Sequence, residues 1–275
     1  MRILAIGDLH GKFPKKLNKE FIKKNKIDII ISSGDFAINK TSKYIFKYWK
    51  QQRERKDKDA NIPREMVGPK KWDNLILQEV KSSVNIIKKL ASLGVPLYFV
   101  YGNGDTTEKA WYYDKNYPSM EQNGINKIKN INLLEMGSEK INGYEIFGFG
   151  CRFTTNIKTQ KHRAKIRALE KKKLDAFFRK RDASKIILLT HETPHMIFDK
   201  IMFKKSPRYG QHVGDDILKE AIKKYQPYLH ICGHMHEYQG MKKIGKALIV
   251  IPGYGYEGKA AVIDLPKKKV KFFKI

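Results

Sequence analysis

Short apolar runs rich in Ile, Val and Leu recur along the chain, and most of them end in Gly followed by a polar residue. Buried strands that lead into loops have this pattern. It predicts strands at residues 3–6, 28–31, 97–101, 145–149, 186–189, 229–232 and 248–251. Two further runs, 260–265 and 270–275, flank a Pro-Lys-Lys-Lys turn and predict a closing hairpin.

Amphipathic segments with helical spacing lie between these runs, at residues 13–24, 75–93, 162–179 and 215–224. Two of them stop at residues that commonly terminate helices, Gly94 and Pro227. Because strands and helices alternate, the predicted fold class is α/β. A chain of 275 residues can bury a core without disulfides, so we expect a single domain over residues 1–275.

Residues 39–73 interrupt this alternation. An aromatic segment, Tyr44 to Trp49, is followed there by a strongly charged one, Lys50 to Lys58. The pattern predicts a helical insertion. Such a helix either docks its aromatic face on the body of the domain, which is the commoner arrangement, or forms a cap over a substrate.

Composition sets broad limits on the class of protein. No stretch approaches the roughly 20 apolar residues of a membrane span, and Asp8 follows too few uncharged residues for a signal-peptide core. Cys151 and Cys232 lie in apolar runs and form no C-x-x-C pair, which fits a reducing compartment. We therefore expect a soluble cytoplasmic protein with no membrane partner.

The formal net charge of +28 has two explanations. A positive field of this size attracts nucleic acid, nucleotides and anionic membranes. Lys dominates the excess and is spread through every segment, as in the Lys-rich proteins of hot or AT-rich organisms. The charge makes nucleic acid a candidate partner but does not decide between these explanations.

Side chains that bind metals follow five of the predicted strands. The segments are Gly7-Asp8-Leu9-His10, Gly34-Asp35, Gly102-Asn103-Gly104-Asp105, Thr190-His191-Glu192 and Gly233-His234-Met235-His236. In open α/β sheets the carboxyl ends of strands meet at one edge, so these segments can converge. Two Asp, one Asn and four His offer hard oxygens with borderline nitrogens, which suits Mn, Fe, Zn or Co better than Ca. Each fragment alone is common, and the ordered combination is not.

The ordered pattern D-x-H, G-D, G-N-x-D, H and G-H-x-H, from Asp8 to His236, resembles the calcineurin-like metallophosphoesterase superfamily. Gln211-His212-Val213-Gly214 and Cys232 to Glu237 resemble, more narrowly, its archaeal and bacterial Icc-related branch. The resemblance implies a two-sheet β-sandwich flanked by helices, with two divalent transition-metal ions at its mouth. Mn²⁺ is the expected ion, and Fe, Zn²⁺, Co²⁺ and Ni²⁺ are alternatives.

The resemblance also assigns roles to seven side chains. It implies that Asp8, His10 and His236 hold the first ion, that Asn103, His191 and His234 hold the second, and that Asp35 bridges them. Two cations about 3.5–4 Å apart polarise phosphoryl oxygens and lower the pKa of a shared water, so that hydroxide attacks in line. On this basis we expect Asp35 and Asn103 to be essential for hydrolysis.

One position departs from the family pattern. Most members have His after the Asn of G-N-x-D, and that His is thought to protonate the leaving oxygen, whereas this chain has Gly104. Loss of a general acid typically costs about 10²–10⁴ in rate unless the leaving group is good or another donor acts. His195 and His212 are the candidate substitutes, and the alternative is that both are structural loop histidines.

Three functions remain open at this point. The leading prediction is a metal-dependent phosphodiesterase acting on nucleotides, cyclic nucleotides or nucleic-acid ends. A phosphomonoesterase or phosphoprotein phosphatase of the same fold ranks lower, because the latter usually carries arginines within its G-D and G-N motifs and this chain has none there. The third is a nucleic-acid-binding scaffold without turnover, for which a complete set of metal ligands has no use. The sequence predicts no oligomeric state.

Overall fold

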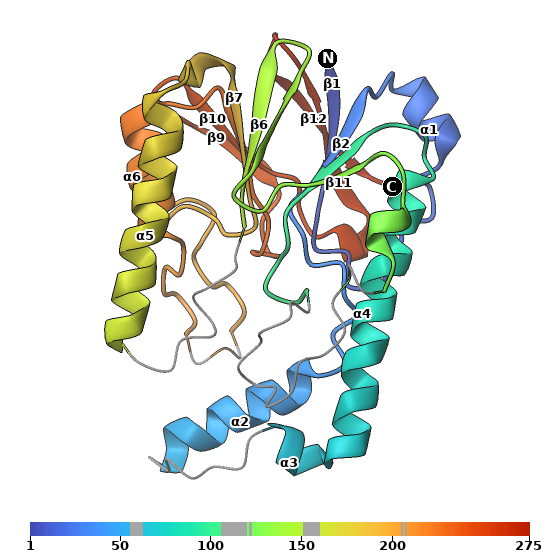
Figure 1. The fold of residues 1–275 in the computed structure, drawn as a ribbon, viewed down its shortest axis with the longest axis vertical. Coiled ribbons are helices and arrows are strands. Elements are labelled where there is room, and N and C mark those ends of the chain that lie inside the picture. Colours follow the sequence, from blue (N-terminus) through green and yellow to red (C-terminus); the bar gives the residue numbers. More distant parts are fainter. Residues whose placement is uncertain (56–62, 106–119, 121–122, 151–159, 205, 207) are drawn as a thin grey trace.

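Two six-stranded mixed sheets face each other in the computed structural model (Figure 1). It describes residues 1–55, 63–105, 120, 123–150, 160–204, 206 and 208–275. The first sheet has the order β12-β11-β1-β2-β3-β4 and the second the order β5-β6-β7-β8-β10-β9. The strands of the first are β12 (Lys269–Lys274), β11 (Lys259–Asp264), β1 (Arg2–Ile6), β2 (Ile29–Ser32), β3 (Leu97–Phe99) and β4 (Ile131–Leu133). Those of the second are β5 (Ser138–Ile141), β6 (Tyr144–Phe149), β7 (Ile186–Thr190), β8 (Leu229–Ile231), β10 (Ala247–Ile251) and β9 (Gly240–Ile244).

Alternate side chains of the central strands enter different layers of the core. In β1, Ile3 and Ala5 point between the two sheets, whereas Leu4 and Ile6 point to the helices that cover the first sheet. The same alternation in β7 sends Ile187 between the sheets. Because these strands are apolar on both faces, they appear in the sequence as continuous apolar runs.

Helices cover the outer face of each sheet (Figure 1). The first sheet packs against α1 (Lys19–Lys24) and α4 (Pro69–Ala91), and the second against α5 (Gln160–Arg179) and α6 (Asp216–Tyr225). Short 3₁₀ turns complete the elements, at η1 (Ile125–Lys127), η2 (Ala183–Lys185) and η3 (Gly255–Glu257). The layers therefore run helix, sheet, sheet, helix, as expected for the sandwich.

All nine predicted strands are confirmed to within a few residues, and three strands were not predicted. These are β4, β5 and β9, which lie at sheet edges and are largely unburied. The prediction of a helix at 13–24 is wrong for the first half of that range. Helix α1 starts only at Lys19, because Asn18 caps it by accepting the backbone N–H of Phe21 at 2.8 Å.

Most of the described part of segment 39–73 is helical, as predicted, and forms α2 (Ser42–Arg55), α3 (Pro63–Val67) and the first turn of α4. Tyr44 meets Trp72 edge to face with ring centroids 6.4 Å apart, and Tyr48 is buried. Part of the aromatic face thus docks on α4. The pair α2 and α3 also extends beyond the sheets, on the side to which β1 and β2 run (Figure 1).

Two of the sequence predictions concern residues outside the described ranges. The charged end of the insertion, within 56–62, is one of them, and Cys151 is the other. Cys232 is described, and it is a buried free thiol. No helix in the described ranges is long and apolar enough to cross a membrane.

Candidate metal centre

The carboxyl ends of five strands, β1, β2, β3, β7 and β8, lead into the predicted ligand segments. Four of the predicted ligands come together directly. Ligand atoms of Asp8, His10, Asp35 and His236 all lie within 4.8 Å of one another. Asp8, His10 and Asp35 are buried, and His236 is half-buried.

The first group of donors consists of Asp8, His10 and His236. His10 Nε2 and His236 Nε2 are 3.1 Å apart, and Asp8 Oδ1 is 3.5 Å from His236 Nε2. Ligands bound about 2.0–2.2 Å from one ion at right angles lie about 3 Å from each other. The spacing of these donors therefore suits a shared cation.

The second group is a triangle of donors from three different loops. Asn103 Oδ1 lies 2.8 Å from both His191 Nε2 and His234 Nδ1, and the two nitrogens are 3.1 Å apart. This spacing also fits one cation. The structure thus brings the predicted residues together in the same two sets that the sequence resemblance implies.

Asp35 lies between the two groups. Its Oδ2 is 3.6 Å from His10 Nε2 in the first group and 3.7 Å from His191 Nε2 in the second. Its other oxygen, Oδ1, accepts the backbone N–H of Gly104 at 2.7 Å. A carboxylate in this place can contact an ion on either side, so the donor set fits a dinuclear site.

Hydrogen bonds on the far side of the histidine rings orient them. His191 Nδ1 lies 2.8 Å from the carbonyl of Ser33, and His10 Nδ1 lies 3.3 Å from that of Ala37. A ring that donates from Nδ1 presents the lone pair of Nε2 to the centre. His234 is turned the other way, with Nε2 3.6 Å from Glu192 Oε2 and Nδ1 directed to Asn103.

Four of the seven candidate ligands have a left-handed backbone conformation. Their φ angles are 54° at Asp8, 42° at His10, 56° at Asp35 and 69° at His234. Such residues cost about 1–3 kcal/mol each and persist where the surrounding structure determines them, which is frequent at functional sites. These strained backbone positions are therefore positions of candidate metal ligands.

Asp105 holds two of the ligand loops together, a role that the sequence did not reveal. Its carboxylate accepts the backbone N–H groups of Asp35 at 2.9 Å, Phe36 at 2.9 Å and Gly102 at 2.9 Å. The close approach also requires glycine, since a Cβ on Gly102 would lie 2.1 Å from Asp35 Oδ1. The motif G-N-x-D contained Asp105, but its spacing does not show which backbone groups the side chain meets.

The charges of the centre shift several pKa values. Burial alone would lower the pKa of His191, but Asp35 and Asp8 raise it to about 9. Burial would raise the pKa of Asp8, and the contact with His236 and the charge of His191 hold it below its ordinary value. The protonated histidine compensates for the carboxylates, so protons compete with cations for these donors.

Comparison with known proteins decides the family. The family model described as metallophosphoesterase, calcineurin superfamily, matches residues 1–275. The chain belongs to this family. A search among curated proteins finds no match. The family match covers the superfamily as a whole, and it does not test the narrower resemblance to the Icc-related branch.

Solved structures share the fold of this metallophosphoesterase. One crystal structure has a TM-score of 0.66 at 20% identity, over 99% of this chain and 98% of the other. The TT1561 protein of Thermus thermophilus has a TM-score of 0.57 at 17% identity, over 99% and 98%. A protein of Danio rerio described as a dimetal phosphatase has a TM-score of 0.55 at 10% identity, over 99% and 95%. At these identities the likeness concerns the fold.

His195 and His212 lie together in the metallophosphoesterase, although they are 17 positions apart in the numbering. Their Nδ1 atoms share the buried carboxylate of Asp199, at 3.4 Å and 2.6 Å respectively. Asp199 also accepts the backbone N–H groups of Met196 and Gly214. Burial would raise the pKa of Asp199, but the bond to His212 and these N–H groups lower it. Sequence reasoning missed Asp199, for which no motif gave a signal.

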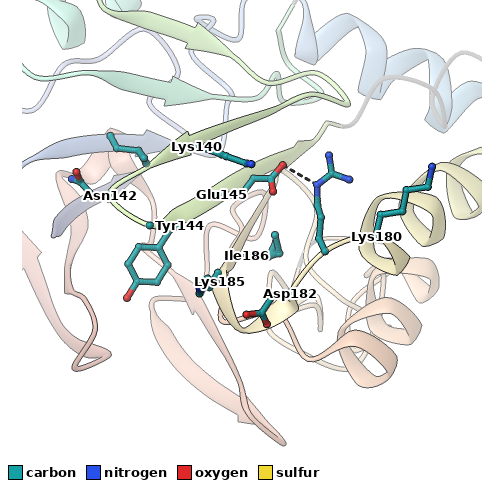
Figure 2. A pocket seen from close by; sticks show the side chains of 11 residues that line it. Lys140, Asn142, Tyr144, Glu145, Lys180, Asp182, Lys185 and Ile186 are labelled. Atoms are coloured by element: carbon teal, nitrogen blue, oxygen red, sulfur yellow. Dashed lines mark hydrogen bonds and ion pairs between the residues drawn. The ribbon is translucent and has the colours of Figure 1, made fainter.

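Figure 2 shows a second site, a cavity of about 500 Å³ at the starts of strands of the second sheet. Residues at the starts of β6 and β7 line it, including Tyr144 and Ile186, whereas His191 follows the end of β7. Lys140, Lys180 and Lys185 contribute positive charge to its wall. This cavity is separate from the candidate metal centre and contains none of its donors.

Proposed function

We propose that this metallophosphoesterase hydrolyses phosphodiesters with two divalent ions, Mn²⁺ being the ion to test first. The observation that carries the proposal is the arrangement of seven donors in two sets that meet at Asp35. Asp8, His10 and His236 would hold one ion and Asn103, His191 and His234 the other. When bound, such a pair polarises phosphoryl oxygens and makes a water molecule acidic near neutral pH.

The chain's own residues would determine where the ions and the ester lie. The carbonyl of Ser33 fixes the tautomer of His191, so that the lone pair of its Nε2 faces the centre. Glu192 lies on the far side of the His234 ring, 3.6 Å from Nε2. Asp105 fixes the loop of Asp35 through backbone N–H groups. Asn103 contributes a neutral oxygen, which would leave its ion more electrophilic than a carboxylate would.

We also propose that a histidine held by Asp199 protonates the leaving oxygen. It would take over the role of the family histidine that Gly104 replaces in this chain. His212 is the stronger candidate, because its Nδ1 lies 2.6 Å from Asp199 whereas that of His195 lies 3.4 Å away. A buried carboxylate bonded to Nδ1 orients the ring and leaves Nε2 available to a ligand. This pair would let the enzyme act on esters with poor leaving groups.

Nucleotides, cyclic nucleotides and nucleic-acid ends are the proposed substrates. Support comes from the net charge of +28, which draws polyanions to the surface. The exposed lysines around the far cavity and on α5 are candidate contacts for a longer nucleic acid. A salt titration of oligonucleotide binding tests this point, since many phosphate contacts give a steep loss of affinity with salt.

The test of the proposed function is a substrate panel. The protein is stripped with a chelator and assayed with each divalent ion on a diester, a cyclic nucleotide and a monoester. We expect activity only after metal is restored, and higher kcat/KM on the diesters. Faster turnover of the monoester supports the alternative phosphomonoesterase. Binding of oligonucleotides without hydrolysis under any of the ions supports the scaffold.

A further inference from the structure

A stack of aromatic rings leads outward from the candidate metal centre. The ring of Tyr254 stacks on His236 with centroids 4.1 Å apart and planes at 10°. Tyr254 also meets His10 edge-on, at 5.9 Å. Tyr254 also stacks on Tyr256, at 5.4 Å and 20°. Two tyrosines thus connect a candidate ligand to the protein surface.

Backbone hydrogen bonds fix this stack to the loop that carries the first ligands. Gly255 N–H donates to the carbonyl of Gly7 at 3.0 Å, and Tyr256 N–H donates to that of Asp8 at 3.0 Å. A side chain at Gly255 would place Cβ 2.2 Å from the Gly7 oxygen, so only glycine permits this contact. The position of Tyr256 relative to Asp8 is therefore set by the main chain.

The outer end of the stack combines an open ring with a positive charge. Tyr256 is 41% exposed, although its backbone N–H donates to the carbonyl of the buried Asp8. The ammonium of Lys12, two residues after His10, lies 4.4 Å from the centre of the Tyr256 ring. Lys12 has a flexible, exposed side chain, so its ammonium can leave the ring and reach an anionic oxygen of a ligand.

We infer that Tyr256 and Lys12 form a subsite for the aromatic base of a nucleotide substrate. Tyr254 supports the ring of Tyr256 by stacking on it. The inference rests on the proposed function and names the part of the substrate that this side of the site recognises. The base stacks on Tyr256, which suits any base because each has a π face. Lys12 pairs with phosphate oxygens of the same molecule.

Tyr254 supports the stack rather than reacting. Burial and the neighbouring Tyr256 raise its pKa to about 12, so its hydroxyl stays protonated through the physiological range. Glu257 next to the stack pairs with Lys259, at 2.8 Å, whereas Lys12 is directed to the ring of Tyr256. A phosphoester without an aromatic group can pair with Lys12 but gains nothing from the ring of Tyr256.

The experiment compares the binding of adenosine 5′-monophosphate and ribose 5-phosphate by calorimetry, with and without Mn²⁺. Both ligands carry the same phosphate, so the ratio of their Kd values isolates the base. We expect the adenine to tighten binding about tenfold, in the range that stacking on one aromatic ring supplies. Tyr256→Leu should reduce the ratio to near one, and Tyr256→Phe should keep it. Lys12→Gln should weaken both ligands by a similar factor.

Tyr144→Leu is the matched control, because Tyr144 lines the far cavity. It should leave the ratio unchanged. A ratio near one in the wild-type protein, or one that survives Tyr256→Leu, overturns the inference. Hydrolysis of a diester on the same preparations separates the two claims. Turnover without base preference leaves the proposed function in place, whereas base preference without turnover under any ion contradicts the function and supports the subsite.

Discussion

The carboxylate of Asp105 accepts the backbone N–H of Asp35 at 2.9 Å, and so fixes the residue that lies between the two groups of donors. It bonds in the same way to the next residue, Phe36, and to Gly102. These bonds reach main-chain groups and no ligand side chain. The influence of Asp105 on the metal centre is therefore positional, exerted through two loops of the main chain.

Asp105→Asn replaces one acceptor oxygen with an amide that donates, opposite N–H groups that also donate. The loop of Asp35 should shift, and metal affinity should fall by about 10–100-fold, as is typical when a partner of a ligand is removed. Calorimetric titration with Mn²⁺ checks this, alongside circular dichroism to verify the fold. Unchanged affinity in a folded variant would show that the network does not position Asp35.

Gly102→Ala tests the close packing of the loops. The new Cβ would lie 2.1 Å from Asp35 Oδ1 and 2.6 Å from Asp35 N, which the site cannot accommodate without moving. We expect a loss of about 1–3 kcal/mol in the free energy of unfolding and a large loss of hydrolysis. Gly137→Ala is the control, because a Cβ there meets nothing within 4 Å. Equal behaviour of the two variants in urea unfolding and in the assay argues against tight packing at Gly102.

Glu79 gives a prediction on pH dependence. Its buried carboxylate accepts the backbone N–H of Thr41 at 2.7 Å and the Thr41 hydroxyl. Burial outweighs these bonds and raises the pKa of Glu79 from 4.5 to about 7. The folded state then binds more protons than the unfolded state between these pH values, so this group makes stability fall as pH rises from about 4.5 to about 7.

Glu79→Gln retains an acceptor for Thr41 but does not titrate. Urea unfolding of the metal-free proteins at pH 5 and pH 8 should show a smaller pH dependence in the variant, by up to ~3 kcal/mol. The difference between the two proteins isolates Glu79 from the other titrating groups. Identical changes with pH in both would mean that Glu79 is ionised throughout.

The proposed proton donor is tested by comparing diesters with poor and good leaving groups. His212→Gln should lower turnover of an alkyl diester by about 10²–10⁴, because an alkoxide needs a proton as it leaves. Turnover of an aryl diester, with its good leaving group, should change little. His195→Gln should have the weaker effect on both substrates, as its contact to Asp199 is longer. If His212→Gln slows both esters equally, the residue serves the structure and not proton transfer.

The sequence predicted the centre of the fold better than its edges. Strand β1 is apolar on both faces and was found from its pattern, whereas β9 exposes Lys242 and Lys243 at a sheet edge and resembles a loop. The helix predicted at 13–24 begins too early, because the apolar spacing continues through residues that form turns before Asn18. Burial on both faces leaves a continuous apolar run in the sequence. A half-exposed edge strand was found only in β12, where a turn next to the apolar run marked a hairpin.

The candidate ligands could be predicted because each follows a strand within a short motif. Asp199 and Tyr254 could not, because their roles come from contacts between loops far apart in sequence. Tyr254 stacks on His236, and Asp199 bonds to His212. Neither contact has a fixed spacing that a single sequence displays. The same holds for Asp105, whose partners are main-chain groups of the preceding loop.

The central claim is that seven side chains hold two cations that share Asp35. The most direct test is the number of metal ions bound per chain after reconstitution with Mn²⁺, measured by elemental analysis together with diester hydrolysis. We predict about two ions in the wild-type protein, about one in His236→Ala and in Asn103→Ala, and no metal-dependent hydrolysis in Asp35→Ala. A fully active wild-type protein with one ion or none, or wild-type turnover by Asp35→Ala, would contradict the account.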